Sequence, residues 1–116
     1  MMNWFESNFP ITEWGRVDWA KVRGCLCSRW EDLSEASEQI NLLVSQQGST
    51  LGWSYILWSD ATKPMIRVPE TVLRAEMTPL LEVDWDTWIL NPESRWCIEV
   101  YHEGEVCFGR RALVAI

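Results

Sequence analysis

The sequence lacks any long hydrophobic run. No stretch approaches the roughly 20 apolar residues that a membrane-spanning helix needs. The first ten residues, MMNWFESNFP, also lack the basic region followed by an apolar run that marks a secretory signal peptide. We therefore expect a protein that makes no contact with a membrane and stays in the cytoplasm.

Residue patterns for catalysis and metal binding are also scarce. The single histidine, His102, has no nucleophile motif to accompany it. Cys25 and Cys27 are separated by one residue, whereas zinc ligands usually come in pairs with two to four residues between them. The chain has no glycine-rich phosphate loop and no calcium loop. We expect no enzymatic activity, no metal and no cofactor.

The cysteines are few, and we expect all of them to remain thiols in the cytoplasm. They are Cys25, Cys27, Cys97 and Cys107. If WCIEVYHEGEVCFG is a hairpin that turns at Glu103-Gly104, Val100 faces Cys107. Strand alternation then places Cys97 and Cys107 on opposite faces. That arrangement excludes a disulfide between these two residues.

Basic residues are outnumbered, with 10 Lys and Arg against 17 Asp and Glu, a net charge of −7. Phosphate backbones would repel such a chain, so we expect no nucleic-acid binding. The acidity is local, because residues 76–105 contain eight acidic residues and only one basic residue, Arg95. Elsewhere the acidic and basic residues balance.

Tryptophan and periodic apolar residues are plentiful, with nine tryptophans in 116 residues. A chain of this length is enough for a single domain, 1–116. The spacing of apolar residues predicts a helix over about 33–47, with Asp32 and Glu35 at capping-box spacing and Gly48 as its stop. Shorter helical pieces are expected in NWFESNF, in DWAKVRGCL with Asp18 as N-cap, and in PETVLRAEM, which Pro79 would end or kink.

After Gly52 the apolar period changes to two, which is typical of strands. Strands are expected in the segments WSYILWS, MIRV, DTWIL, WCIEVYH and EVCFG, and the tail ALVAI would extend the last one. Helices followed by a meander of strands predict an α+β fold. We expect an antiparallel sheet of about five strands, packed against one longer helix and several short ones.

The stretch LLEVDWDTWIL, residues 80–90, sets carboxylates between large apolar residues. Alternation in a strand would bury Trp85 and let Asp84 and Asp86 project. These acids fit either a solvated strand face or a surface for a basic partner. Aromatic anchors within a charged rim favour an interface. The candidate partner-binding residues are Glu82, Asp84, Asp86, Glu93, Glu99, Tyr101, Glu103 and Glu105.

A small, acidic, tryptophan-rich α+β chain that closes with WCIEVYHEGEVCFG resembles the immunity proteins of bacterial contact-dependent growth inhibition and related polymorphic toxin systems. The resemblance implies a cognate partner, the C-terminal domain of a toxin, which is often a nuclease. The acidic surface would then bind a basic toxin domain and neutralise it. An intracellular adaptor or structural subunit that binds a basic protein, or a small enzyme, remains the alternative.

Overall fold

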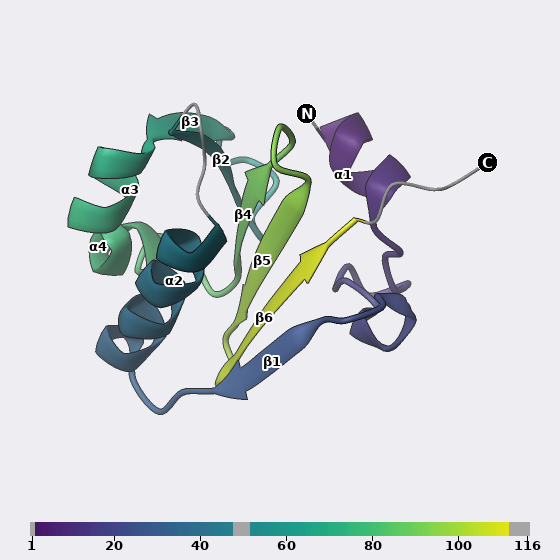
Figure 1. Cartoon of the computed structure of the whole chain (residues 1–116), viewed down its shortest axis with the longest axis horizontal. Helices are drawn as coiled ribbons and strands as arrows, with labels where there is room; N and C mark the ends of the chain where they lie inside the picture. Colours follow the sequence, from purple (N-terminus) through teal and green to yellow (C-terminus); the bar gives the residue numbers. More distant parts are fainter. Residues whose placement is uncertain (1, 48–51, 112–116) are drawn as a thin grey trace.

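The computed structural model describes residues 2–47 and 52–111, which form one six-stranded sheet with two layers around it (Figure 1). Its strand order is β1-β6-β5-β4-β2-β3, and every neighbouring pair is antiparallel. The predicted α+β fold is confirmed, with six strands where about five were expected.

The strands are β1 (Leu26–Arg29), β2 (Trp53–Trp58), β3 (Ile66–Pro69), β4 (Thr87–Asn91), β5 (Trp96–Tyr101) and β6 (Glu105–Arg110). The helices are α1 (Met2–Asn8), α2 (Leu33–Gln47), α3 (Glu70–Ala75) and α4 (Met77–Leu81), with a 3₁₀ turn, η1, at Trp19–Lys21. None of the helices in the described ranges has the length and hydropathy that a bilayer crossing requires.

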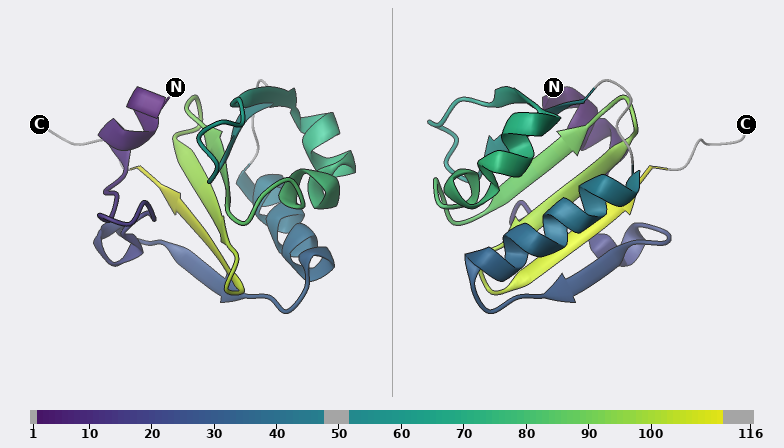
Figure 2. Two further views of the ribbon diagram at one scale, coloured as in Figure 1. Left: turned by 180° about the vertical axis from the view of Figure 1, so that it is seen from behind. Right: turned by 60° about the vertical axis from the view of Figure 1, so that its left-hand side comes forward.

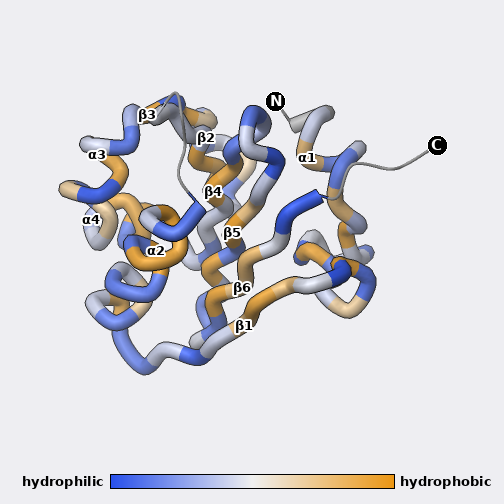
Figure 3. Tube along the Cα trace, viewed as in Figure 1, coloured by the Kyte–Doolittle hydropathy of each residue, from blue (hydrophilic) through white to orange (hydrophobic). Residues whose placement is uncertain are grey.

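Both faces of the sheet are covered. Helices α2, α3 and α4 lie on one face, and α1 with the irregular segment that follows it lies on the other (Figure 2). Hydrophobic residues recur along the central strands (Figure 3). Ile56, Ile89 and Ile98 pack on the helical side, whereas Leu57 and Leu90 pack beneath the N-terminal segment. The middle of the sheet is therefore buried on both sides.

Helix α2 forms as the sequence predicts. The Asp32 carboxylate accepts a hydrogen bond from the backbone N–H of Glu35 at 2.9 Å, which satisfies a donor at the helix start. Ala36, Ile40 and Val44, spaced four apart, are buried against the sheet. Gly48, the predicted stop, and the tail ALVAI lie outside the described residues.

The segment DWAKVRGCL is not a helix, contrary to the prediction. The side chain of Asp18 makes no capping hydrogen bond, and the helical turn η1 ends at Lys21. Gly24 then has a positive φ of 71°, which is not helical. β1 follows and pairs with β6, which adds the strand that the sequence did not reveal. Pro79 does not end its helix either. It lies in the first turn of α4, where a backbone N–H has no helical partner, and the break falls at Glu76 instead.

The β5–β6 hairpin differs from the predicted register by one residue. Its turn is His102-Glu103-Gly104, so Glu99 faces Cys107 and Val100 faces Val106. Gly104 has φ 93°, and a Cβ there would lie 2.8 Å from the carbonyl oxygen of Trp30. A one-residue shift reverses the face of every side chain in one strand. Cys97 and Cys107 therefore share a face, which corrects the sequence prediction.

Two of the cysteines form a disulfide, so the expectation of four thiols is wrong. Cys27 lies opposite Cys107 in the β1–β6 pair, with their Cα atoms 4.1 Å apart, and their sulfurs are bonded. This pair was not foreseen because β1 was not predicted as a strand. Cys25 and Cys97 are free. Burial, with the charge of Glu99, raises the pKa of the Cys97 thiol well above its ordinary value.

A thiol count tests this pairing. Protein purified without reductant and then denatured should react at Cys25 and Cys97 alone, because Cys27 and Cys107 are joined. Replacing Cys27→Ser should free Cys107 and raise the count by one equivalent. Alkylation followed by mass spectrometry measures both. Full labelling of all the wild-type cysteines would contradict the bridge.

Candidate functional site

A buried carboxylate organises the face of the sheet that α1 covers. Glu99 on β5 is fully buried. Its Oε1 accepts hydrogen bonds from Arg16 Nε at 2.7 Å and Trp19 Nε1 at 3.0 Å. Its Oε2 accepts from the backbone N–H of Val17 at 2.8 Å and from Trp88 Nε1 at 3.0 Å. A charge removed from water requires such compensation, and three of these donors come from the N-terminal segment.

Arg16 carries the compensating positive charge. Its Nη2 lies 2.7 Å from Glu99 Oε1 and 2.7 Å from Glu105 Oε1. Its guanidinium carbon lies 3.8 Å from the centre of the Tyr101 ring. Burial alone would lower the pKa of Arg16, but the hydrogen bonds and charges of Glu105 and Glu99 raise it. We call Arg16, Trp19, Trp88, Glu99 and Glu105 the Glu99 cluster.

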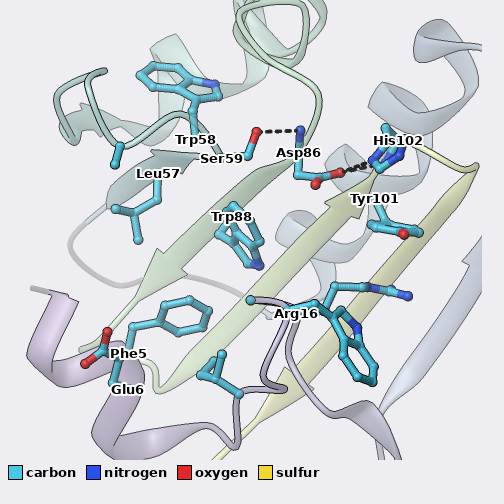
Figure 4. A pocket seen from close by; sticks show the side chains of 14 residues that line it. Phe5, Glu6, Arg16, Leu57, Trp58, Ser59, Asp86, Trp88, Tyr101 and His102 are labelled. Carbon is cyan, nitrogen blue, oxygen red and sulfur yellow. Dashed lines mark hydrogen bonds and ion pairs between the residues drawn. The ribbon is translucent and has the colours of Figure 1, made fainter.

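A pocket of about 480 Å³ opens above this cluster (Figure 4). Phe5 and Glu6 reach it from α1, and Trp88 and Tyr101 come from the sheet. The full lining is Phe5, Glu6, Ile11, Trp14, Gly15, Arg16, Leu57, Trp58, Ser59, Ala61, Asp86, Trp88, Tyr101 and His102. The pocket is thus aromatic, with charged groups from several elements.

Two tryptophans in this region are turned to solvent. Trp14, in the pocket lining, is 71% exposed, and Trp85 is 73% exposed. The Trp85 ring lies 4.8 Å from the His102 ring, which lies 4.6 Å from the Tyr101 ring. Asp86 holds His102 in place, since its Oδ1 lies 2.8 Å from both the backbone N and the Nδ1 of His102. Tyr101, His102 and Trp85 thus form an aromatic row that leads from the pocket lining to solvent.

The alternation predicted for residues 82–86 is wrong. Helix α4 ends at Leu81 and β4 begins only at Thr87, so these residues form a turn. Asp84 accepts hydrogen bonds from the backbone N–H groups of Trp85 at 2.8 Å and Asp60 at 2.7 Å, and these bonds lower its pKa. A turn exposes backbone donors that a nearby aspartate can satisfy. Asp84 and Asp86 consequently bind groups of the protein itself, whereas Trp85 points outward.

The candidate partner-binding residues do not form one surface in the folded protein. Asp86, Tyr101, Glu99 and Glu105 come together at the pocket and the cluster below it. The prediction that Glu99 lies on the surface is wrong, because its side chain is fully buried. The side chains of Glu82, Glu93 and Glu103 are exposed. Glu93 lies in the β4–β5 turn, whereas the pocket lies at the other end of these strands.

The N-terminal residues contribute to the site, which was not predicted from the sequence. Phe5, Ile11, Trp14 and Arg16 complete the pocket, although they are far from the acidic segment in sequence. One available signal was the stretch WGR, 14–16, which places a tryptophan and an arginine in an irregular region. The partners of Arg16 could not be read from it, because Glu99 is 83 residues away.

One group in the described part of the chain has metal-binding residue types, namely Cys27, Glu105 and Cys107, whose ligand atoms lie within 4.8 Å of one another. The two sulfurs are bonded to each other, and Glu105 is paired with Arg16. In this state the group offers no thiolate, which is the form of cysteine that binds metals.

The chain also matches a known protein family. A model of the family described as CdiI immunity protein, EcoliA0-like, matches residues 1–109. A search of curated proteins found no match. The matched span contains every residue of the pocket lining and of the Glu99 cluster.

Removing the Arg16 guanidinium should destabilise the protein, because Glu99 would remain buried without its counter-charge. We expect Arg16→Ala to lower the free energy of unfolding by about 3 kcal/mol. Arg23→Ala is the control: it removes an exposed arginine from the same segment and should change stability by less than about 0.5 kcal/mol. Urea unfolding followed by tryptophan fluorescence measures both. If Arg16→Ala and the wild-type protein unfold at the same urea concentration, the Glu99 cluster does not hold the N-terminal segment.

Proposed function

The chain belongs to the CdiI immunity protein family, EcoliA0-like, and from this premise we propose that it neutralises the cognate toxin C-terminal domain by binding it. The observation that carries the proposal is the family match, which spans residues 1–109. Inhibition is stoichiometric and non-enzymatic, since an immunity protein acts by occupying its toxin. We further propose that the complex forms in the cytoplasm, where the toxin would act.

The toxin that we propose is a basic domain, of the nuclease class. A nuclease holds phosphates with Lys and Arg, so its substrate-binding surface attracts an acidic protein. The net charge of −7 of this chain supports that pairing. Opposite charges also steer two proteins together and speed association, which favours capture of a toxin before it acts.

The acids available to such a partner differ from those that the sequence suggested. In the segment 76–105, Glu99 and Glu105 pair with Arg16, and Asp84 lies 3.7 Å from Lys63. Their charges are therefore partly offset within the protein. The acidic side chains of that segment that remain exposed are Glu76, Glu82, Glu93 and Glu103. The N-terminal segment adds Glu6 and Glu13, which are also exposed.

Binding to the toxin domain encoded beside this chain tests the proposal. Co-expression should restore growth to cells that make that domain. The purified proteins should form a complex whose association slows about tenfold or more between low and high salt, because salt screens the attraction. Stopped-flow fluorescence over a series of salt concentrations measures the rate.

Two results would count against this function. If the adjacent domain neither forms a complex nor becomes harmless on co-expression, the immunity role is wrong. If the complex forms at a rate that salt does not change, the immunity role stands and the basic character of the toxin is wrong.

A further inference from the structure

We propose that the pocket above the Glu99 cluster receives a lysine or arginine side chain from a loop of the toxin domain. This inference rests on the proposed function and names the contact through which it operates. The occupant follows from three properties of the pocket: the sign of its charge, the rings that line it, and the exposed tryptophans beside it.

The charge around the pocket favours a cation. Glu6 and Asp86 contribute carboxylates to the lining. Arg16 is also in the lining, but Glu99 and Glu105 both hold it from below. The lining and the cluster below it therefore hold four carboxylates and one guanidinium, together with His102, which lies against Asp86. The excess negative charge would repel an acidic side chain and attract a basic one.

The lining suits the shape of a basic side chain as well as its charge. Its rings are Phe5, Trp14, Trp58, Trp88, Tyr101 and His102. The faces of Trp and Tyr rings attract cations, and this protein already places the Arg16 guanidinium over Tyr101 at 3.8 Å. Ile11 and Leu57 offer apolar surface to the aliphatic stem of an incoming lysine or arginine. A purely apolar side chain would bring no charge to oppose the excess of carboxylates.

The exposed tryptophans indicate a protein partner. Trp14 and Trp85 leave most of their rings in water, although a tryptophan gains free energy when it is buried. Such rings are frequent anchors of protein interfaces. The pocket volume of about 480 Å³ is in the range of small-ligand sites. One side chain can therefore enter together with part of the loop that carries it.

Matched variants test the pocket against the adjacent toxin domain. Trp14→Ala should weaken binding about 30-fold, as loss of an aromatic anchor does, and Glu6→Lys should weaken it about tenfold by repelling the cation. The controls are Trp53→Ala, a 43% exposed tryptophan at the other end of β2, and Glu38→Lys, an exposed position on α2 with the same change in net charge. We expect both controls to stay within about threefold of wild type. Calorimetric titration gives the dissociation constants, and thermal melts check the folding of each variant.

The toxin side of the contact identifies the occupant. Lysines and arginines of the toxin domain are replaced one at a time by methionine, which keeps the stem and removes the charge. One replacement should weaken binding to the wild-type protein and have much less effect on binding to Trp14→Ala, because coupled residues are not additive. If no basic residue shows this coupling, the occupant is wrong.

The outcomes separate this inference from the function beneath it. Failure of the wild-type chain to bind the toxin domain would overturn the proposed function. Tight binding by wild type, Trp14→Ala and Glu6→Lys alike would leave that function intact and overturn the pocket proposal. Equal losses in the pocket variants and in the two controls would also overturn it, since the effect would then not be specific to the pocket.

Discussion

The buried carboxylate of Glu99 is the constraint on which the rest of the structure depends. An ion in the interior is tolerated only if its oxygens are hydrogen-bonded and its charge is opposed. Trp88 supplies one donor from the sheet, while Arg16, Val17 and Trp19 supply the others from the N-terminal segment. That segment is irregular, so its position on the sheet is defined by these bonds and by the packing of its apolar residues.

The same requirement shapes the candidate interface. Arg16 turns toward Glu99 and Glu105 and forms part of the pocket lining, so the loop around it carries Ile11 and Trp14 to the pocket. The acidic segment therefore has two roles. Some of its carboxylates hold turns and the N-terminal segment in place, and the others face solvent. A count of acids in the sequence overstates how many of them can meet a partner.

Some helices and strands could be predicted from the sequence and others could not. Helix α2 was predicted with its bounds, because its cap and its apolar spacing are both local signals. Strands β2 and β3 were also predicted, because apolar residues recur there with a period of two. The alternation of a strand was wrongly extended back over residues 84–86, where Asp84 binds backbone donors of a turn and Trp85 faces solvent. β1 was missed because all four of its residues are exposed, so no periodicity marks it.

The sequence by itself determined the α+β class, the long helix, most of the strands and the resemblance to immunity proteins, because composition and short-range periodicity are properties of neighbouring residues. Only the tertiary structure decided which carboxylates are buried, which cysteines are joined and which residues make the pocket. Cys27 and Cys107 are 80 residues apart, and Arg16 and Glu99 are 83 apart. Contacts at such separations depend on strand order and on a hairpin register that a single turn residue shifts. Alternation within β5 places Glu99 on the face that the N-terminal segment covers, where its charge needs Arg16.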